Sequence, residues 1–318
     1  MMQLLIAGVV IVTAGLSALV IFTAITARRV EKALPPRGQF VEVSGARIHY
    51  LDKGSGPPIV ILHGLAGQMG NFTYALLERL TDDFRVLLID RPGSGYSRRA
   101  PGATGRLPEQ AAIVAEFIRK LGLERPLLVG HSLGGAIALG VALDHPEAVK
   151  ALALVAPLTH IPKQVPAPFR ALDIKSNFFR WLVAWTVATP IGIRRGKAIL
   201  AAIFSPDPAP ADFPIRGGGI LGLRPRSFLN TSSDLRTVGL DLGKQVARYS
   251  SLRVPVHILY GTDDHVLDYK VHGDAMKAKS PMASLDLVKG GHMLPITAPE
   301  LTAEFIKSAA RGETAVSA

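Results

Sequence analysis

Val129-Gly130-His131-Ser132-Leu133-Gly134-Gly135 is the stretch that decides the predicted fold. It follows a short apolar run, 126–129, typical of a buried strand, and precedes a run of small residues, 135–143, typical of a helix. The pattern Gly-x-Ser-x-Gly at a strand-to-helix turn indicates a nucleophile elbow, in which strain lifts the serine hydroxyl clear of the sheet. We therefore predict that Ser132 is a nucleophile.

The composition predicts a folded protein with an anionic partner. The 318 residues are 48% hydrophobic and only 19% charged, which excludes a disordered chain. The absence of cysteine excludes disulfides, thiolate catalysis and cysteine-ligated metals. A net charge of +11 favours an anionic partner, but no zinc-finger spacing, RNA-binding aromatic motif or long basic run accompanies it. We therefore expect a membrane surface and no nucleic acid.

The first 27 residues are predicted to form a transmembrane anchor. Residues 4–27 contain no charged side chain, and at about 1.5 Å per residue they span roughly 36 Å, enough to cross a bilayer. A cleaved signal peptide is the competing interpretation, but it requires a basic start and a small-x-small cleavage site. Residues 1–3 carry no side-chain charge, and Ile25-Thr26-Ala27 is a poor cleavage site, so the sequence favours an anchor.

The charges that follow this span predict its orientation. Four basic residues against one acidic residue follow it: Arg28, Arg29, Lys32, Arg37 and Glu31. By the positive-inside rule, the protein is expected to be a single-pass membrane protein with its catalytic domain in the cytoplasm. Residues 28–38 are predicted to be a linker, because Pro35-Pro36 ends a helix.

Apolar runs farther along the chain predict alternating strands and helices. Predicted strands are 40–43 and 47–51 as a hairpin, then 58–62, 85–89, 126–129, 149–155, 254–260 and 283–288; amphipathic helices are predicted at 108–121 and from 299. This alternation predicts an α/β fold with a mostly parallel sheet covered on both faces. The expected segments are a core over 39–157 and 251–318, interrupted by a helical cap over 158–250.

The partners that a serine nucleophile requires also follow predicted strands. A serine hydroxyl needs a general base, and the base needs an acid that fixes its tautomer. Asp263 and Asp264 follow the strand that ends at Tyr260, and His292 follows the strand that ends at Val288. Because sites in parallel sheets lie beyond the carboxyl ends of the strands, all these groups are expected at one edge.

The chain resembles the α/β-hydrolase superfamily with a cap domain, over roughly residues 39–311. Five ordered motifs carry the resemblance: His63-Gly64, Asp90-Arg91-Pro92-Gly93-x-Gly95, Gly130-His131-Ser132-Leu133-Gly134-Gly135, Gly261-x-x-Asp264-x-Val266 and Gly291-His292. The resemblance implies Ser132 as the nucleophile, Asp264 as the acid and His292 as the base. The Gly-x-x-Asp-x-Val spacing selects Asp264 and leaves Asp263 as a turn residue.

An acyl-transfer transition state also needs donors for its oxyanion. The backbone N–H of Leu133, directly after the nucleophile, and that of Leu65, in the loop after His63-Gly64, are predicted to form the oxyanion hole. The remaining histidines are expected to be structural: His63 to shape its loop, His131 to pack away from the site, and His160, His265 and His272 to lie on the surface. No metal and no cofactor are expected, because no residues stand at metal-ligand spacing.

The cap combines a basic surplus with an aromatic stretch. Residues 158–250 contain 13 Lys or Arg and 5 Asp. The apolar stretch consists of Phe178, Phe179, Trp181, Leu182, Trp185 and Ile191. One interpretation is a cap helix that buries this face on the core, the commoner fate of such stretches. The other is a face that rests on lipid, with the basic residues against anionic head groups.

Ser132 also bears on the reaction class. Epoxide hydrolases and haloalkane dehalogenases resemble this pattern but carry aspartate at the elbow, so Ser132 argues against both. We therefore predict a serine hydrolase, similar to carboxylesterases and lipases, that cleaves a small to medium lipophilic ester through an acyl-enzyme without a cofactor. A carbon–carbon bond hydrolase or a cofactor-free perhydrolase or haloperoxidase-like enzyme is the alternative. A non-catalytic pseudo-hydrolase is disfavoured, because the triad and its glycines are intact.

Overall fold

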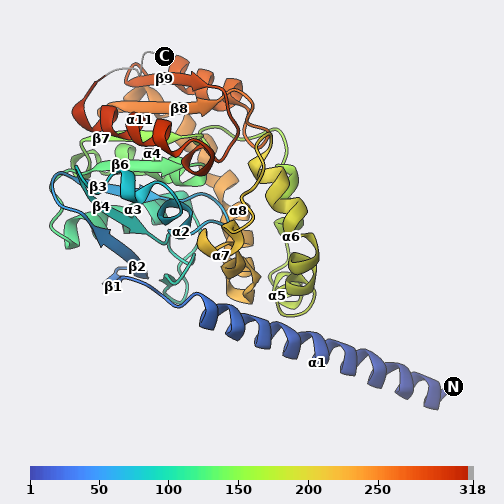
Figure 1. The fold of residues 1–318 in the computed structure, drawn as a ribbon. Coiled ribbons are helices and arrows are strands. Elements are labelled where there is room, and N and C mark those ends of the chain that lie inside the picture. The colour runs from blue at the N-terminus through green and yellow to red at the C-terminus, as the bar shows by residue number, and fades with distance from the viewer. Residues whose placement is uncertain (314–318) are drawn as a thin grey trace.

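A twisted nine-stranded sheet forms the centre of the described residues, 1–313 (Figure 1). In this computed structural model the strands are β1 Gln39–Val43, β2 Ala46–Lys53, β3 Pro58–Leu62, β4 Arg85–Ile89, β5 Arg98–Arg99, β6 Leu127–His131, β7 Ala151–Val155, β8 Val256–Gly261 and β9 Ala283–Val288. The last five residues of the predicted core segment 251–318 lie outside the described residues.

The strand order β1-β2-β4-β3-β6-β7-β8-β9 brings the predicted site elements to one edge of the sheet. Strands β4, β3, β6, β7, β8 and β9 are parallel neighbours, whereas β1 and β2 form the predicted antiparallel hairpin, and the short β5 pairs with β2. The predicted mostly parallel sheet is therefore confirmed. Because β6, β8 and β9 all run in the same direction, the loops that follow them emerge at the same edge.

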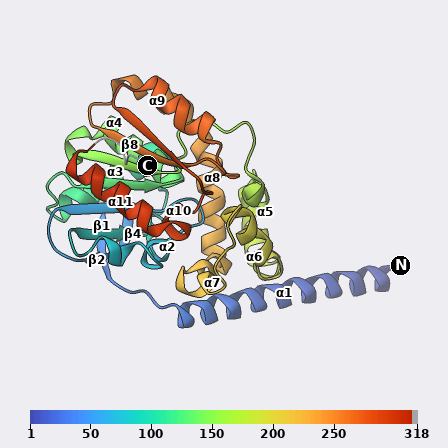
Figure 2. The same ribbon diagram turned by 45° about the horizontal axis from the view of Figure 1, so that its top comes forward.

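Helices cover both faces of the sheet, which explains its continuous apolar strands. The helices are α1 Met2–Ala33, α2 Gly70–Thr73, α3 Leu107–Lys120, α4 Leu133–Asp144, α5 Asn177–Trp185, α6 Ala188–Phe204, α7 Phe213–Arg216, α8 Pro225–Val246, α9 Ala275–Lys279, α10 Leu294–Thr297 and α11 Pro299–Arg311. In β3, Val60 and Leu62 pack with α3 and α4, whereas Ile59 and Ile61 pack on the opposite face with α11. Figure 2 shows α11 and α10 in front of the strands.

Between β7 and β8 the chain leaves the core and forms the helices α5, α6, α7 and α8 (Figure 1). These helices lie within residues 158–250, the range predicted for the cap, and we call this segment the cap. Phe204 and Phe213 from the cap pack with Met293 and Ile296 of the core, so the cap rests beside the loop that carries His292.

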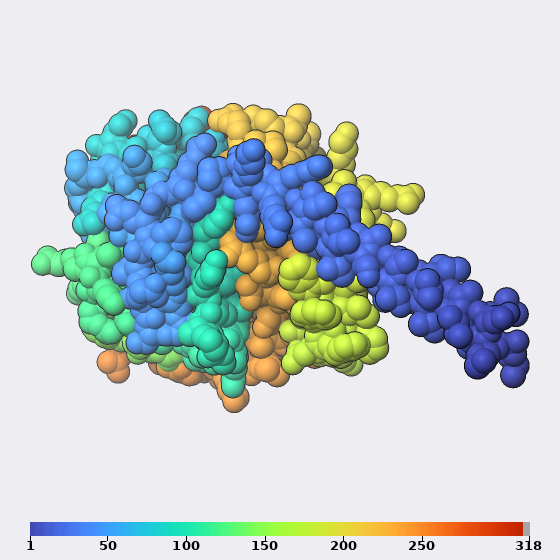
Figure 3. Space-filling view, turned by 90° about the horizontal axis from the view of Figure 1, so that it is seen from below, coloured from blue at the N-terminus to red at the C-terminus, as the bar shows by residue number. Residues whose placement is uncertain are grey.

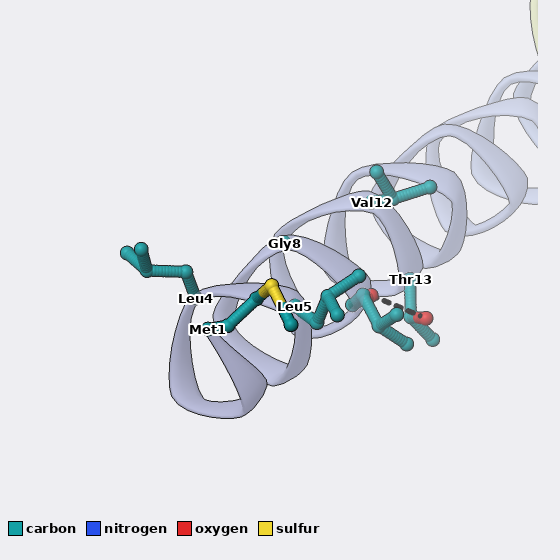
Figure 4. A pocket seen from close by; sticks show the side chains of 7 residues that line it. Met1, Leu4, Leu5, Gly8, Val12 and Thr13 are labelled. Carbon is teal, nitrogen blue, oxygen red and sulfur yellow. Dashed lines mark hydrogen bonds between the residues drawn. The ribbon is translucent and has the colours of Figure 1, made fainter.

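The N-terminal helix α1 is the one helix of the described residues that is long and apolar enough to cross a membrane. Figure 4 shows its N-terminal end, where Leu4, Leu5 and Val12 project from a helix that no other element faces. The hydroxyl of Thr13 donates to the carbonyl of Val9 at 2.8 Å, so this polar group is satisfied within the helix. The side chains at this end meet the requirements of a lipid environment.

The C-terminal third of α1 packs on the cap, and this differs from the predicted linker over 28–38. The helix continues to Ala33 before the chain extends toward β1. Thr23 and Val30 are buried, and the Thr23 hydroxyl donates to the carbonyl of Thr186 at 3.4 Å. Glu31 pairs with Arg224 of the cap at 3.4 Å. The linker prediction was wrong for residues 28–33, because tertiary contacts with the cap extend the helix past the end of the apolar run.

Candidate active site

Ser132 lies at the turn between β6 and α4 in the conformation predicted for the elbow. Its φ is 54° and its ψ is −121°, a region that non-glycine residues rarely adopt. Two hydrogen bonds hold the turn: the Ser132 N–H donates to the carbonyl of Val155 at 3.1 Å, and its carbonyl accepts from Leu158 at 2.9 Å. The neighbouring strand therefore fixes the strained backbone.

Close packing explains the glycines around Ser132. A Cβ on Gly130 would lie 2.6 Å from the carbonyl oxygen of Gly134, and a Cβ on Gly134 would lie 2.4 Å from that of Leu62. A Cβ on Gly64 would lie 2.9 Å from the Cβ of Ser132. The helix after the elbow and the loop after β3 thus approach each other at distances that only glycine permits.

Asp264 and His292 form a buried pair at the same edge of the sheet. His292 Nδ1 lies 2.7 Å from Asp264 Oδ2, and both side chains are almost fully buried. The other oxygen of Asp264 accepts the N–H groups of Val266 and Leu267 at 2.8 and 2.9 Å. Burial by itself would raise the pKa of Asp264, but His292 and these N–H groups together lower it. An ionised Asp264 keeps the proton on Nδ1 and leaves Nε2 of His292 free to act as a base.

His131 connects the elbow to His292. Its Nε2 lies 2.9 Å from the carbonyl oxygen of His292, and the two ring centroids are 4.9 Å apart. The prediction that His131 points away from the site was wrong, because the turn at Ser132 breaks the alternation of the strand. Ser132 and His292 therefore lie at one edge, and no hydrogen bond of residues 1–313 engages the Ser132 hydroxyl or Nε2 of His292.

The N–H groups predicted for the oxyanion hole are free to bind. Within the described part of the chain, neither Leu65 N–H nor Leu133 N–H has an acceptor. Leu133 is the first residue of α4, where N–H groups lack partners inside the helix. Leu65 follows Gly64, which touches Ser132. The catalytic roles of Ser132, Asp264 and His292, and the oxyanion role of these two donors, stay predictions.

Arg91 holds the Leu65 peptide, a role that the sequence analysis did not assign. The buried guanidinium donates to the carbonyl oxygens of Gly64 at 3.0 Å and His63 at 2.8 Å, and it pairs with Asp234 of α8 at 3.1 Å. Because the carbonyl of Gly64 and the N–H of Leu65 belong to one trans peptide, a fixed carbonyl also fixes the direction of this N–H.

Comparison with known proteins identifies the superfamily. A family described as alpha/beta hydrolase fold matches residues 57–191. The chain belongs to the α/β-hydrolase superfamily. Haloalkane dehalogenase 2 of Mycobacterium tuberculosis is 36% identical over 125 residues, or 38% of this chain and 42% of that protein. A component of the acetoin cleaving system of Cupriavidus necator, a dihydrolipoyllysine-residue acetyltransferase, is 39% identical over 122 residues, or 38% of this chain and 32% of that protein.

This α/β hydrolase therefore spans about a third to two fifths of the length of these curated relatives. A solved structure matches more of the chain. It is described as a membrane phospholipase A and a novel bacterial virulence factor, and it superposes with a TM-score of 0.66 at 25% identity. The match covers 98% of this chain and 99% of that one, so it extends over most of α1.

The Arg91 contacts predict a measurable effect on catalysis by the α/β hydrolase. In the variant Arg91→Lys, one ammonium group replaces a planar group that serves several acceptors, so the Leu65 peptide should lose its fixed orientation. We expect kcat to fall about 10²-fold, the size of effect seen when one oxyanion donor is lost, with a smaller change in KM. Arg99→Lys is the matched control, because Arg99 also pairs with Asp234 but does not contact Gly64. Equal losses in the two variants would contradict a role through Leu65.

Buried neutral histidines surround the site. Burial lowers the pKa of His63 and of His131 to about 3, and that of His272 to about 4. The loop-shaping role predicted for His63 agrees with its contacts: Nε2 accepts the N–H of Arg91 at 3.0 Å, and Nδ1 lies 2.8 Å from the Gly64 oxygen. The prediction that His272 lies on the surface was wrong, because its Nδ1 accepts the N–H of Thr159 at 3.3 Å in the interior.

These three histidines predict acid destabilisation of the hydrolase. An unfolded histidine takes up a proton near pH 6.5, whereas the folded His63, His131 and His272 stay neutral until about pH 3 to 4. Above pH 6.5 these histidines therefore do not lower the free energy of unfolding. As the pH falls below 6.5, each histidine lowers it by about 1.4 kcal/mol per pH unit. We expect Tm in detergent to fall between pH 7 and pH 5. His272→Asn, whose amide oxygen can accept the same bond, should lose about a third of this pH dependence, whereas an unchanged dependence would contradict the assignment.

The two other histidines that were predicted to lie on the surface differ in exposure. His265 is exposed and contacts the Ser205 hydroxyl at 2.8 Å, whereas His160 is half-buried. Residues 1–313 contain no group of three His, Asp or Glu side chains placed to hold a metal ion.

A cavity of about 100 Å³ separates the loop after β3, at Ala66, from cap residues that include Leu221 and Phe228. The cavity begins at the residue that follows Leu65.

Proposed function

We propose that the chain is a membrane-anchored serine esterase that cleaves a lipophilic carboxylic ester. The observation that carries this proposal is the buried Asp264–His292 pair, which contacts His131, the residue before the elbow serine. Two unpaired N–H groups, those of Leu65 and Leu133, lie at the same edge of the sheet. A serine favours ester chemistry through an acyl-enzyme. The haloalkane dehalogenase match carries less weight for activity, because Ser132 stands where dehalogenases are expected to carry aspartate.

The proposed reaction uses the same groups in both half-reactions. Ser132 Oγ attacks the acyl carbon and its proton passes to Nε2 of His292, while the N–H groups of Leu65 and Leu133 stabilise the oxyanion. The alcohol leaves with the proton from His292. Water then loses a proton to His292 and attacks the acyl carbon. The bond between the acyl carbon and Ser132 Oγ breaks, Oγ takes the proton back from His292, and the carboxylic acid is released.

The contacts of α1 support an anchor over a cleaved signal peptide. Cleavage after Ala27 would remove Thr23, which is buried against Thr186 of the cap. The matched membrane phospholipase A, aligned over 98% of this chain, favours a lipid ester as the substrate. On the charge of Arg28, Arg29 and Lys32, we place the catalytic domain in the cytoplasm. An alkaline phosphatase fused after Ala318 should therefore be inactive, and an active fusion would overturn this orientation.

The decisive experiment combines labelling with substrate choice. Full-length protein in detergent is treated with a fluorophosphonate, and we expect a covalent adduct on the peptide that contains Ser132. The untreated protein should hydrolyse p-nitrophenyl esters and phospholipid esters but not haloalkanes or epoxides, and the labelled protein should hydrolyse none of them. An unlabelled Ser132, or turnover of a haloalkane instead of an ester, would overturn the proposal.

A further inference from the structure

Large apolar side chains of the cap lie on its surface beside α1. We call this set the α5–α6 surface: Phe178, Phe179, Trp181, Val187, Ile191 and Ile193. Phe178, Phe179 and Trp181 are 66%, 58% and 52% exposed, so the interpretation that this stretch packs on the core was wrong for these residues. Several large exposed apolar side chains on two neighbouring helices are typical of an interaction surface.

The packing of α1 against the cap determines how deep the α5–α6 surface would lie in a membrane that α1 crosses. Residues 2–18 of α1 are exposed, and the contacts with the cap involve Thr23, which bonds to Thr186 between α5 and α6. From Met2 to Phe22 the helix rises about 30 Å, the thickness of a bilayer hydrocarbon core. The α5–α6 junction therefore lies where the hydrocarbon core ends. Figure 3 shows α1 running across the underside of the domain, next to the yellow-green cap, before it projects beyond it.

Unpaired basic side chains accompany the apolar ones. Arg194, Arg195 and Lys197 on α6 and Lys175 before α5 are exposed, and none of them contacts a carboxylate within residues 1–313. Cationic side chains next to aromatic ones are typical of segments that lie in the interface of an anionic membrane.

We propose that the α5–α6 surface inserts into the interface of an anionic bilayer beside α1. The inference rests on the anchoring that we propose for α1, but it does not require catalysis. A second copy of the chain is the competing occupant. It fits less well, because pairing of the same surfaces would bring two sets of the four unpaired cations together. A lipid interface offers an apolar environment for the exposed apolar side chains and negative charge for the unpaired cations. It also brings ester substrates to the cap.

The two tryptophans make this proposal directly testable, because both lie on α5. Trp185→Phe leaves the exposed Trp181 as the sole tryptophan, whose fluorescence can be excited selectively at 295 nm or above. We reconstitute this full-length variant in vesicles of phosphatidylcholine and phosphatidylglycerol. Acyl chains brominated near the head group should quench Trp181 strongly, and aqueous iodide should quench it weakly. In pure phosphatidylcholine, and in the variant Arg194→Gln/Arg195→Gln/Lys197→Gln, bromine quenching should decrease.

Each other outcome overturns a defined part of the argument. Strong iodide quenching without bromine quenching would mean that the surface faces water. Protection from both quenchers would indicate a second copy. Release of the protein from vesicles by alkaline carbonate would overturn the anchor itself. A loss of all ester hydrolysis with bromine quenching intact would overturn the proposed function alone.

A functional readout follows from the same surface. Phe178→Ser/Phe179→Ser changes two exposed side chains that take no part in the site, so the protein should fold. It should hydrolyse lipid esters in vesicles several-fold more slowly and cleave a soluble short ester at the normal rate. Equal rates on the vesicle substrate would contradict docking through α5.

Discussion

Replacing Ser132 with alanine is expected to lower kcat for ester hydrolysis by about 10⁶-fold, the effect seen when a triad serine is removed. The fold should be retained, because the Ser132 side chain makes no hydrogen bond at the start of α4 and the backbone bonds to Val155 and Leu158 remain. The measurement is kcat on a p-nitrophenyl ester, together with fluorophosphonate labelling and Tm in the same detergent.

A matched control separates this chemistry from a general effect of losing a serine hydroxyl. Ser251→Ala removes an exposed hydroxyl that bonds only to the Arg248 carbonyl, and it should label and turn over normally. If Ser132→Ala kept more than about 1% of the rate, the nucleophile would be another residue. A collapsed Tm would instead show that alanine does not tolerate the positive φ of 54° at this position. The variant Ser132→Gly, which adopts this φ freely and also lacks the hydroxyl, would then be used to measure the chemical loss.

The strands of the sheet could be predicted because each buried strand is recognisable from its own run of apolar residues. The apolar runs 58–62 and 85–89 coincide with β3 and β4 to the residue. A strand covered on both faces is continuously apolar, and it ends where His63 or Asp90 carries the chain into a loop. The same logic placed the loops after β8 and β9 at one edge, since these strands are parallel neighbours. The choice of Asp264 over Asp263 as the partner of His292 came from the spacing of the family motif.

The cap and the supporting residues could not be predicted, because their environments depend on distant segments. Helix α5 has an apolar stripe whether that stripe faces the core, α1 or lipid, and the stripe itself does not say which. His272 is buried by the segment at Thr159, more than a hundred residues earlier. Arg91 could be recognised within its motif, but its partner Asp234 comes from the cap, so its link to the Leu65 peptide is visible only in three dimensions.

The second large effect is expected from Asp264→Asn, which should lower kcat by about 10⁴-fold with little change in KM. The asparagine oxygen can still accept the N–H groups of Val266 and Leu267, so the turn should keep its shape. Its NH₂ group would then face Nδ1 of His292 where a carboxylate oxygen stood. An NH₂ group donates, so Nδ1 must accept and the ring proton moves to Nε2, which can no longer take the proton of Ser132.

Asp263→Asn is the matched control, because it makes the same chemical change one residue earlier, on a half-buried carboxylate that does not contact His292. Its kcat should stay within a factor of about two of the original, because no charge at the site is altered. Equal losses in the two variants would mean that the loop after β8 acts through its overall charge. A large loss in Asp263→Asn alone would move the acid to the neighbouring residue and contradict the Gly-x-x-Asp-x-Val assignment. The pair therefore tests the role of one carboxylate independently of the fold that carries it.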